Sequence, residues 1–318
     1  MDIQVNKIAS KISFVANSSA QLELPKAGYI TDILMKLKLN VTGAAMVVEA
    51  EDAIFRLIKS AVIKASGTHN YLDVVDGRQI KFMNAFQYTE SLLENSLPAA
   101  STTADVVAMI PIHLGLDPTN LFDKSIIIPA HDMSNPIIQI NWGAESDLGT
   151  GYTINSGEIE LTIHQILIDE KSETRESVFP RIVEMRMNPE ILNVISTYTN
   201  LGLTKDCPTR HNLYETLLIV LDSSGNRVNT DISEFGIKIA KQNKTPFNIP
   251  FDHLLSDNQR YYDLANRQTG VAMFRWANIS GDKYGYDAKL DQTGDIQMGF
   301  SVDVSGGKIL ILHKRLAM

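Results

Sequence analysis

The hydrophobic and polar residues of this chain alternate with a dominant period of two. Apolar side chains alternate with polar ones over residues 33–41, 158–167 and 296–304. This pattern is typical of a β-strand that buries one face. Residues 213–221 are apolar at nearly every position, which indicates a strand enclosed on both faces. Because turn-forming residues separate these runs, as at 222–226, we predict mostly short antiparallel strands.

Two segments have the spacing of helices instead. Residues 78–94 carry apolar side chains on one helical face, and residues 250–266 begin with a proline, which the first turn of a helix tolerates. Each predicted helix precedes a hydrophobic strand, at 104–114 and at 271–279. A polar loop and two alternating strands then end each half, at 137–142 and 158–168 and again at 295–304 and 308–316. The order of elements therefore repeats, although the residues do not.

The two halves also differ in charge. Residues 1–170 carry 11 basic and 20 acidic side chains, whereas residues 171–318 carry 18 and 17. Between them, residues 169–177 are all charged or hydroxyl-bearing, which suits a linker. We predict an N-terminal arm at 1–10, a first domain at 11–170, a linker at 171–178 and a second domain at 179–318.

About eight strands in each half, with one helix interposed, fit a jelly roll, in which two four-stranded sheets pack together. We therefore predict an all-β chain of two tandem eight-stranded jelly rolls, each with a short interposed helix. Periodicity alone does not define strand connectivity, and another pair of β-sandwiches would give the same pattern.

The residue types that carry catalysis or bind metals are scattered. No two of the seven histidines lie within four residues of each other, and Cys207 is the only cysteine. His131 and Asp132 are adjacent but lie in a proline-flanked loop. Glu158 and Glu160 have the spacing of paired carboxylates, but they share their strand face with polar residues, so we interpret them as a solvated face. We expect no catalytic residue, no metal site and no cofactor.

Other classes of protein fit the sequence poorly. A net charge of −8 disfavours general nucleic-acid binding. The apolar runs are too short for a membrane-spanning helix, and residues 1–10 lack the apolar core of a signal peptide.

Both ends of the chain carry candidate contact residues. Lys314 and Arg315 form the one basic cluster, which is either a solvated end or a contact with anionic lipid or a neighbouring subunit. The N-terminal arm is too short to pack on itself, and we expect it to become ordered only against a neighbour or a membrane. The predicted assembly or membrane-proximal residues are Ile3, Val5, Lys7, Ile8, Lys314 and Arg315.

Several segments resemble a known family. Residues 21–40 contain Leu24-Pro25 and Gly28 ahead of a long strand, and they look like the start of the double jelly-roll major capsid proteins of tailless, membrane-containing icosahedral DNA viruses. A strand at 53–65 would follow. The segments 110–116, 126–129 and 137–143 resemble the closing strands of that family's first roll. The second half is similar in layout only.

The resemblance implies a homotrimeric, pseudo-hexagonal capsomer that tiles an icosahedral shell around an internal membrane. The implied partners are further copies of the chain, neighbouring capsomers, minor capsid or vertex proteins, and membrane lipids near the chain ends. Sequence-specific nucleic-acid binding is not implied, nor is any catalytic residue. The implied location is the virion capsid, assembled in the host cytoplasm.

Two other readings stay open at this point. The chain could be a carbohydrate-binding or glycan-cleaving β-sandwich protein, for which Tyr284 and Tyr286 are the available stacking residues. It could also be a minor capsid or spike protein of the same type of virus.

Overall fold

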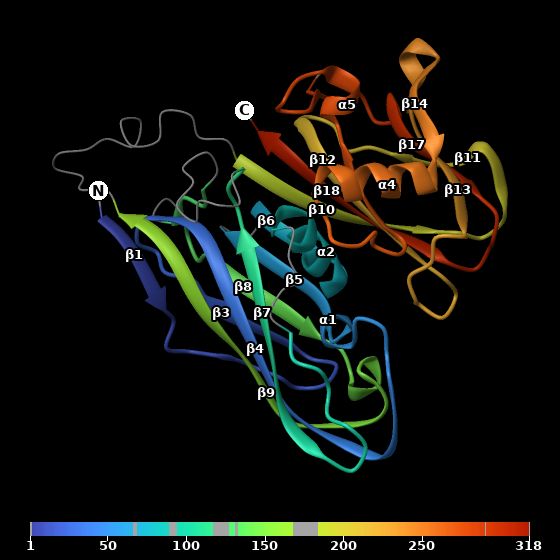
Figure 1. The fold of residues 1–318 in the computed structure, drawn as a ribbon. Helices are drawn as coiled ribbons and strands as arrows, with labels where there is room; N and C mark the ends of the chain where they lie inside the picture. The colour runs from blue at the N-terminus through green and yellow to red at the C-terminus, as the bar shows by residue number, and fades with distance from the viewer. Residues whose placement is uncertain are drawn as a thin grey trace. The chain divides into compact units, whose positions relative to one another are not determined.

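The computed structural model describes residues 2–65, 69–88, 94–116, 127–130, 133–167, 184–289 and 291–317. The chain divides into two compact units, Met1–Met185 and Arg186–Met318. Both consist mainly of antiparallel strands (Figure 1).

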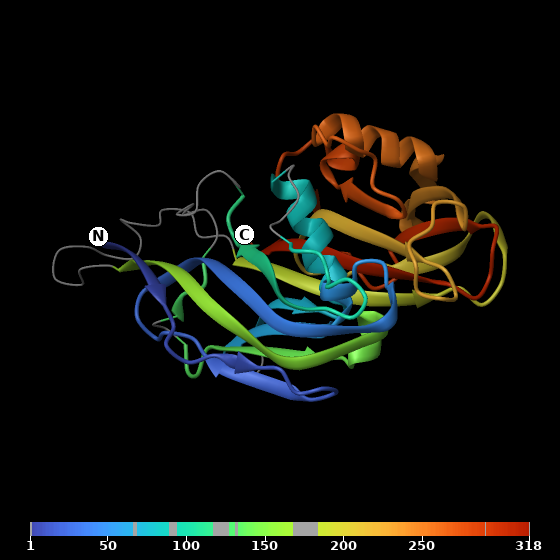
Figure 2. The same ribbon diagram turned by 60° about the horizontal axis from the view of Figure 1, so that its bottom comes forward.

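The first unit is a sandwich of two sheets (Figures 1 and 2). One sheet has the order β1-β9-β4-β7, formed by Asp2–Lys7, Gly149–Leu167, Tyr29–Glu49 and Thr103–His113, and β2 (Ile12–Ser13) also pairs with β9. The other has the order β3-β8-β5-β6, formed by Ser19–Glu23, Ile137–Trp142, Ile58–Ala65 and His69–Val74. Its helices are α1 (Ala53–Arg56), α2 (Gly77–Tyr88) and the 3-10 turn η2 (Glu145–Asp147).

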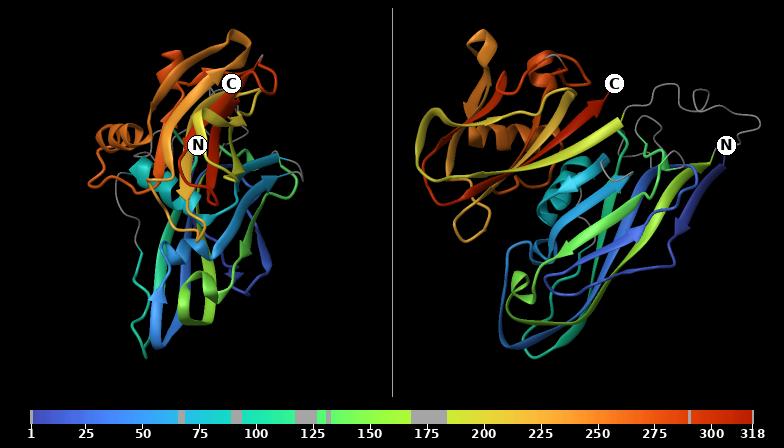
Figure 3. Two further views of the ribbon diagram at one scale, coloured as in Figure 1. Left: turned by 90° about the vertical axis from the view of Figure 1, so that its right-hand side faces the viewer. Right: turned by 180° about the vertical axis from the view of Figure 1, so that it is seen from behind.

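The second unit has the same construction (Figure 3). One sheet has the order β10-β18-β12-β15, formed by Glu184–Asn193, Lys308–Ala317, Asn212–Leu221 and Val271–Arg275, and β16 (Tyr286–Asp287) also pairs with β12. The other has the order β11-β17-β13-β14, formed by Tyr198–Asp206, Ile296–Val302, Ile232–Ile239 and Lys244–Pro250. Its helices are η3 (Ala240–Gln242), α4 (Phe251–Tyr261) and α5 (Ala277–Ser280).

The two units match strand for strand. In each one the chain moves between the two sheets in the same sequence, and the helix α2 or α4 follows the fifth of the eight principal strands. This interleaved order is that of a jelly roll. The prediction of two tandem eight-stranded jelly rolls, each with an interposed helix, is confirmed.

The alternating pattern of the sequence explains which face of each strand is buried. On β4, Ile33, Met35, Leu37 and Leu39 are almost completely buried, while the lysines between them are only partly covered. The core of the second unit contains a cluster of aromatic rings in mutual contact. The Phe235 ring lies 5.3 Å from the ring of Phe274 and 5.5 Å from that of Phe300, at angles typical of favourable aromatic pairs.

An asparagine on each long helix binds the backbone of a sheet's edge strand. The Asn84 side chain on α2 donates from Nδ2 to the Pro111 carbonyl of β7 at 2.7 Å. The Asn258 side chain on α4 donates to the Met273 carbonyl of β15 at 2.8 Å and accepts from the Met273 N–H at 2.6 Å. Because edge strands carry unpaired backbone groups, these contacts occupy part of one sheet edge in each unit.

Several sequence-based boundaries need correction. Residues 53–65 begin as helix α1, and β5 starts only at Ile58. Residues 271–279 end as helix α5 rather than as strand. The helix predicted at 250–266 ends at Tyr261, and α2 starts at Gly77. The predicted linker at 171–178 lies outside the described residues, so the predicted domain limits stay predictions.

The predicted N-terminal arm at 1–10 is also wrong as a free segment. Residues Asp2–Lys7 form β1, which pairs antiparallel with β9 along its whole length. Pairing with β9 therefore satisfies half of the backbone hydrogen-bonding groups of β1, and no neighbouring chain or membrane is needed to order this strand. No helix within the described residues is long and apolar enough to cross a membrane.

The asparagine contacts can be tested by substitution. Asn258→Ala leaves the buried N–H and C=O of Met273 without these partners, and we expect the free energy of unfolding to fall by about 2–4 kcal/mol. Asn84→Ala removes a single bond and should cost about 1 kcal/mol. Urea denaturation followed by tryptophan fluorescence measures both, because Trp142 and Trp276 are the only tryptophans and lie one in each unit. Equal costs for the two variants would contradict the assignment.

Candidate assembly surfaces

The predicted residues near the N-terminus lie mostly on one face of β1. Ile3, Val5 and Lys7 stand opposite Ile166, His164 and Thr162 of β9, on the outer face of the β1-β9-β4-β7 sheet. The two apolar side chains are 52% and 57% exposed. Ile8 lies just beyond β1 and is only partly exposed, and its backbone N–H donates to the Leu161 carbonyl at 2.9 Å. β1 thus presents an exposed apolar pair, Ile3 and Val5, at the edge of this sheet.

Beside this pair, three lysines surround one carboxylate. Lys38, Lys7 and Lys11 place their ammonium groups 2.7, 3.2 and 3.2 Å from the carboxylate oxygens of Glu160. Hydrogen bonds from Lys38, Lys7 and Lys11 lower the pKa of Glu160 to about 2. Lys11 also binds Glu158 at 2.5 Å. The interpretation of this strand as an ordinary solvated face is therefore wrong for Glu160, which is 8% exposed and belongs to an ion-pair network.

A second acidic residue on the same sheet lies between two histidines. The Asp32 carboxylate on β4 is buried, and its oxygens lie 2.9 Å from Nδ1 of His164 on β9 and 3.3 Å from Nδ1 of His113 on β7. Burial by itself would raise the pKa of Asp32, but the hydrogen bonds to the two histidines outweigh it, and the pKa lies below its ordinary value. Sequence spacing could not identify this cluster, because three separate strands contribute to it.

The second unit has a similar arrangement at the matching position. Glu215 on β12 stands opposite Lys314 of β18 and Arg275 of β15, as Asp32 stands opposite His164 and His113. In each unit the pairing slips by one residue immediately before the carboxylate, at Thr31 or at Tyr214.

The helix asparagines show independently that Asp32 and Glu215 occupy equivalent positions in the two units. Pro111 and Met273, which bind these asparagines, stand opposite Leu34 and Leu217. Each of these leucines comes two residues after the carboxylate. Both units therefore hold an acidic side chain between basic ones at the same bulge, although the residue types differ.

The predicted basic cluster at the C-terminal end is contradicted. Lys314 and Arg315 are 5% and 9% exposed, since β18 is an inner strand between β10 and β12. Arg315 donates from Nε to the Asn188 side chain at 2.9 Å and from Nη1 to the Thr209 carbonyl at 3.2 Å. Lys314 lies 3.8 Å from the Glu215 carboxylate. These side chains support the fold of the second unit and do not form an exposed patch.

Next to them, His313 is completely buried. Its Nδ1 lies 2.9 Å from the Thr216 hydroxyl, which also accepts the indole N–H of Trp276 at 2.9 Å. Burial lowers the pKa of His313 to about 3, with the nearby charge of Arg315 as a further cause. The histidine is therefore neutral at physiological pH.

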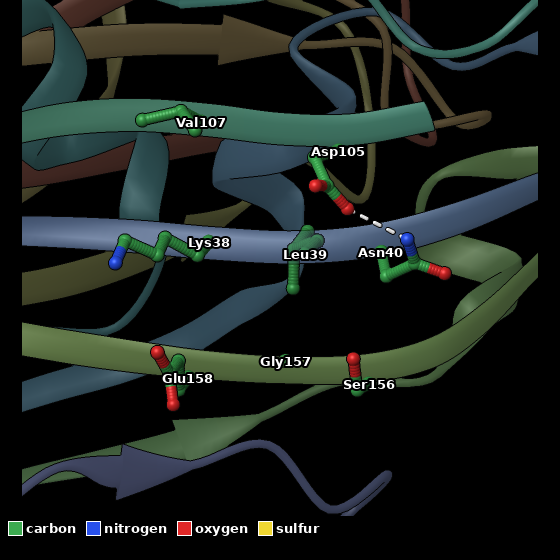
Figure 4. A pocket seen from close by; sticks show the side chains of 8 residues that line it. All are labelled: Lys38, Leu39, Asn40, Asp105, Val107, Ser156, Gly157 and Glu158. Atoms are coloured by element: carbon green, nitrogen blue, oxygen red, sulfur yellow. Dashed lines mark hydrogen bonds between the residues drawn. The ribbon is translucent and has the colours of Figure 1, made fainter. Parts of the chain in front are cut away.

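The remaining features give no catalytic arrangement. A groove of about 360 Å³ crosses strands β9, β4 and β7, where Asn40 donates to Asp105 at 2.6 Å and no aromatic side chain is present (Figure 4). Tyr286 packs beside the buried Trp276, with ring centroids 6.1 Å apart, so it forms no exposed stacking platform with Tyr284. Cys207 is 3% exposed, and burial raises the pKa of its thiol.

Within the described residues, no group of three or more His, Cys, Asp or Glu side chains could hold a metal ion. His131 and Asp132 lie outside those residues.

No protein-family model matches the sequence, and no curated protein is significantly similar to it. The major capsid protein of STIV, the Sulfolobus turreted icosahedral virus, superposes with a TM-score of 0.83 at 14% identity, covering 100% of this chain and 97% of that one.

Two further solved structures agree. The major capsid protein P2 of bacteriophage PM2 gives a TM-score of 0.58 at 10% identity, covering 100% of this chain and 98% of that one. The PBCV-1 virus capsid protein gives 0.65 at 8% identity, with 99% and 94% covered.

The lysine network can be tested with Glu160→Gln. Because the folded-state pKa lies below the ordinary 4.5, the stabilisation is present above pH 4.5 and is lost as the pH falls towards 2. We expect a lower melting temperature at pH 7 in low salt and a difference that vanishes near pH 2 or in 1 M salt. Glu158→Gln is the control, since that carboxylate binds Lys11 alone and should change less. A Glu160→Gln effect that is independent of both pH and salt would argue against the network.

His313 gives a second pH test, whose window begins at a higher pH than that of Glu160. Its folded-state pKa lies below the ordinary 6.5, so its contribution is complete above pH 6.5 and declines as the pH falls towards 3. We expect the free energy of unfolding to drop by on the order of 1 kcal/mol per pH unit in that window, and His313→Leu to flatten the profile. His253→Gln, an exposed helix residue, should leave the slope unchanged. Parallel profiles for all three proteins would refute the assignment.

The fold, the twice-repeated strand order and the structural comparisons agree over the whole chain. This chain therefore has the double jelly-roll fold of the viral major capsid proteins.

Proposed function

We propose that this chain is the major capsid protein of an icosahedral virus. The observation that carries the proposal is the double jelly roll itself, which superposes on the STIV major capsid protein over essentially the full length of both chains. Fold alone does not define function, so the proposal also uses the character of the surfaces. Within the described residues these surfaces offer ion-pair networks and an exposed strand edge, with no catalytic arrangement, and they suit a non-enzymatic building block.

The capsomer is proposed to be a homotrimer. Three copies of a chain with two similar units place six such units around one axis, and this gives a pseudo-hexagonal outline that can tile a shell. Closed rotational symmetry also makes the contact between successive copies identical. Further copies are therefore the main partners, with minor capsid or vertex proteins as additional ones.

An internal membrane beneath the shell is part of the proposal and rests on the family resemblance of residues 21–143. The lipid contact is not assigned to Lys314 and Arg315, because both are buried within the second unit. The residues near the N-terminus remain the proposed contact residues, namely Ile3, Val5, Lys7 and Ile8. A linker at 171–178 between the two rolls likewise remains a proposal.

The trimer is tested by size-exclusion chromatography with light scattering on the full chain. We expect a stable species of about three times 35.3 kDa. Electron microscopy of the concentrated protein, or of particles from infected cells, should show pseudo-hexagonal capsomers with this chain in the majority.

The alternative functions predict different outcomes. A monomer that binds glycans on an array would contradict the capsid proposal and favour a carbohydrate-binding protein. A chain found at only a few copies per particle would favour a minor capsid or spike protein.

A further inference from the structure

The outer edges of the two larger sheets are not equally protected. Asn84 binds a backbone carbonyl on the β7 edge, and Asn258 binds both the N–H and the C=O of one residue on the β15 edge. The β10 edge contains Pro189, which lacks an N–H and interrupts any ladder that another strand could form there. These are the usual means of preventing unwanted strand pairing.

The β1 edge has none of these protections in the described part of the chain. Its six residues, Asp2–Lys7, include no proline, and they end the sheet order β1-β9-β4-β7. Among them Ile3 and Val5 are β-branched, apolar and more than half exposed. Its charged residues, Asp2 and Lys7, stand only at the two ends of the strand, and the apolar β-branched centre between them favours the addition of another strand.

The backbone direction along β1 is known from its pairing with β9. The N–H of Ile8 donates to Leu161, so the even-numbered residues direct their backbone groups towards β9. Because this direction alternates along a strand, the N–H and C=O groups of Ile3, Val5 and Lys7 point to the open edge. A partner strand must therefore bond to the odd-numbered residues.

The sequence of β1 is self-complementary in one such register. An antiparallel copy centred on Gln4 places Ile3 opposite Val5 of the second copy, twice by symmetry, and these form the hydrogen-bonded pairs. Gln4 then stands opposite Gln4, and Asp2 opposite Asn6. Apolar β-branched side chains meet on the outer face and polar ones on the other, and no like charges are opposed.

We propose that β1 of one chain pairs antiparallel with β1 of a second copy about a two-fold axis at Gln4, joining the two β1-β9-β4-β7 sheets into one. Such a contact is isologous, since the same patch serves both partners. The proposed role of this pairing rests on the proposed function. In a capsid, the pairing would join neighbouring capsomers about a two-fold axis, in addition to the contacts within each trimer.

Disulfide trapping in the full chain tests the register. Residues opposite each other in a non-hydrogen-bonded pair have Cα atoms about 4.5 Å apart, within the range of a disulfide. Gln4→Cys should therefore form a covalent dimer under mild oxidation. Asn6→Cys is the matched control, because its two copies would lie about 13 Å apart.

The expected dimer yield for Gln4→Cys is at least about tenfold above that of Asn6→Cys, whose geometry excludes the bond. A mixture of Asp2→Cys and Asn6→Cys chains should also cross-link, although neither does so alone. The native Cys207 is buried and should not compete. Absence of the Gln4→Cys dimer, or similar yields from all single variants, would overturn the proposal.

A backbone variant separates strand pairing from mere proximity. Val5→Pro in the Gln4→Cys chain removes an outward N–H without touching the bonds to β9, and it should abolish the cross-link. Val5→Ala keeps that N–H and should retain most of it. Equal cross-linking in both variants would refute strand pairing.

Light scattering on the same samples distinguishes this inference from the proposed function. Trimers without the Gln4→Cys cross-link would refute β1 pairing alone. Cross-linked dimers of an otherwise monomeric chain would refute the trimer and leave β1 pairing standing.

Discussion

The pairing of β4 with β9 is the interaction on which the first unit depends. It runs from Tyr29 opposite Ile166 to Glu49 opposite Gly149, so every paired residue lies 100 or more positions from its partner in the chain. Closing so long a loop is costly, and the apolar faces of both strands must be buried to offset that cost. Once the register is set, Asp32 lies beside His164, and Lys38 lies within reach of Glu160.

The second unit has an equivalent long strand pair, built from different residues. β12 and β18 take the places of β4 and β9, with the same one-residue slip before the acidic side chain. A side chain after a bulge is directed by the backbone rather than by its own type, so Asp32 with histidines and Glu215 with lysine and arginine can occupy equivalent places. The internal repeat is one of backbone geometry, which explains why the residues of the two halves show no repeat.

A sandwich of two open sheets also leaves edges that must be closed, used or blocked. The interposed helices α2 and α4 each bind the backbone of one edge strand, β7 or β15, through a single asparagine side chain. Among the four edges of the two larger sheets, β1 is the one with neither a bound asparagine nor a proline in the described part of the chain. The buried faces of these sheets stabilise each unit, whereas an open sheet edge is available for association with another strand.

The sequence by itself determined the strand-rich class of the chain and its two long helices, but it missed the short helices α1 and α5 and the strand β1. Alternation of apolar and polar residues defines which face of a strand is buried, and the spacing at 78–94 and 250–266 revealed both long helices. It failed where the deciding contact is non-local. Lys314 and Arg315 read as an exposed basic end, yet β18 is an inner strand that buries them. Only the tertiary structure decided the register between distant strands. That register created the Asp32 cluster, the Glu160 network and the open β1 edge, because a one-residue slip would carry every one of these side chains to the opposite face.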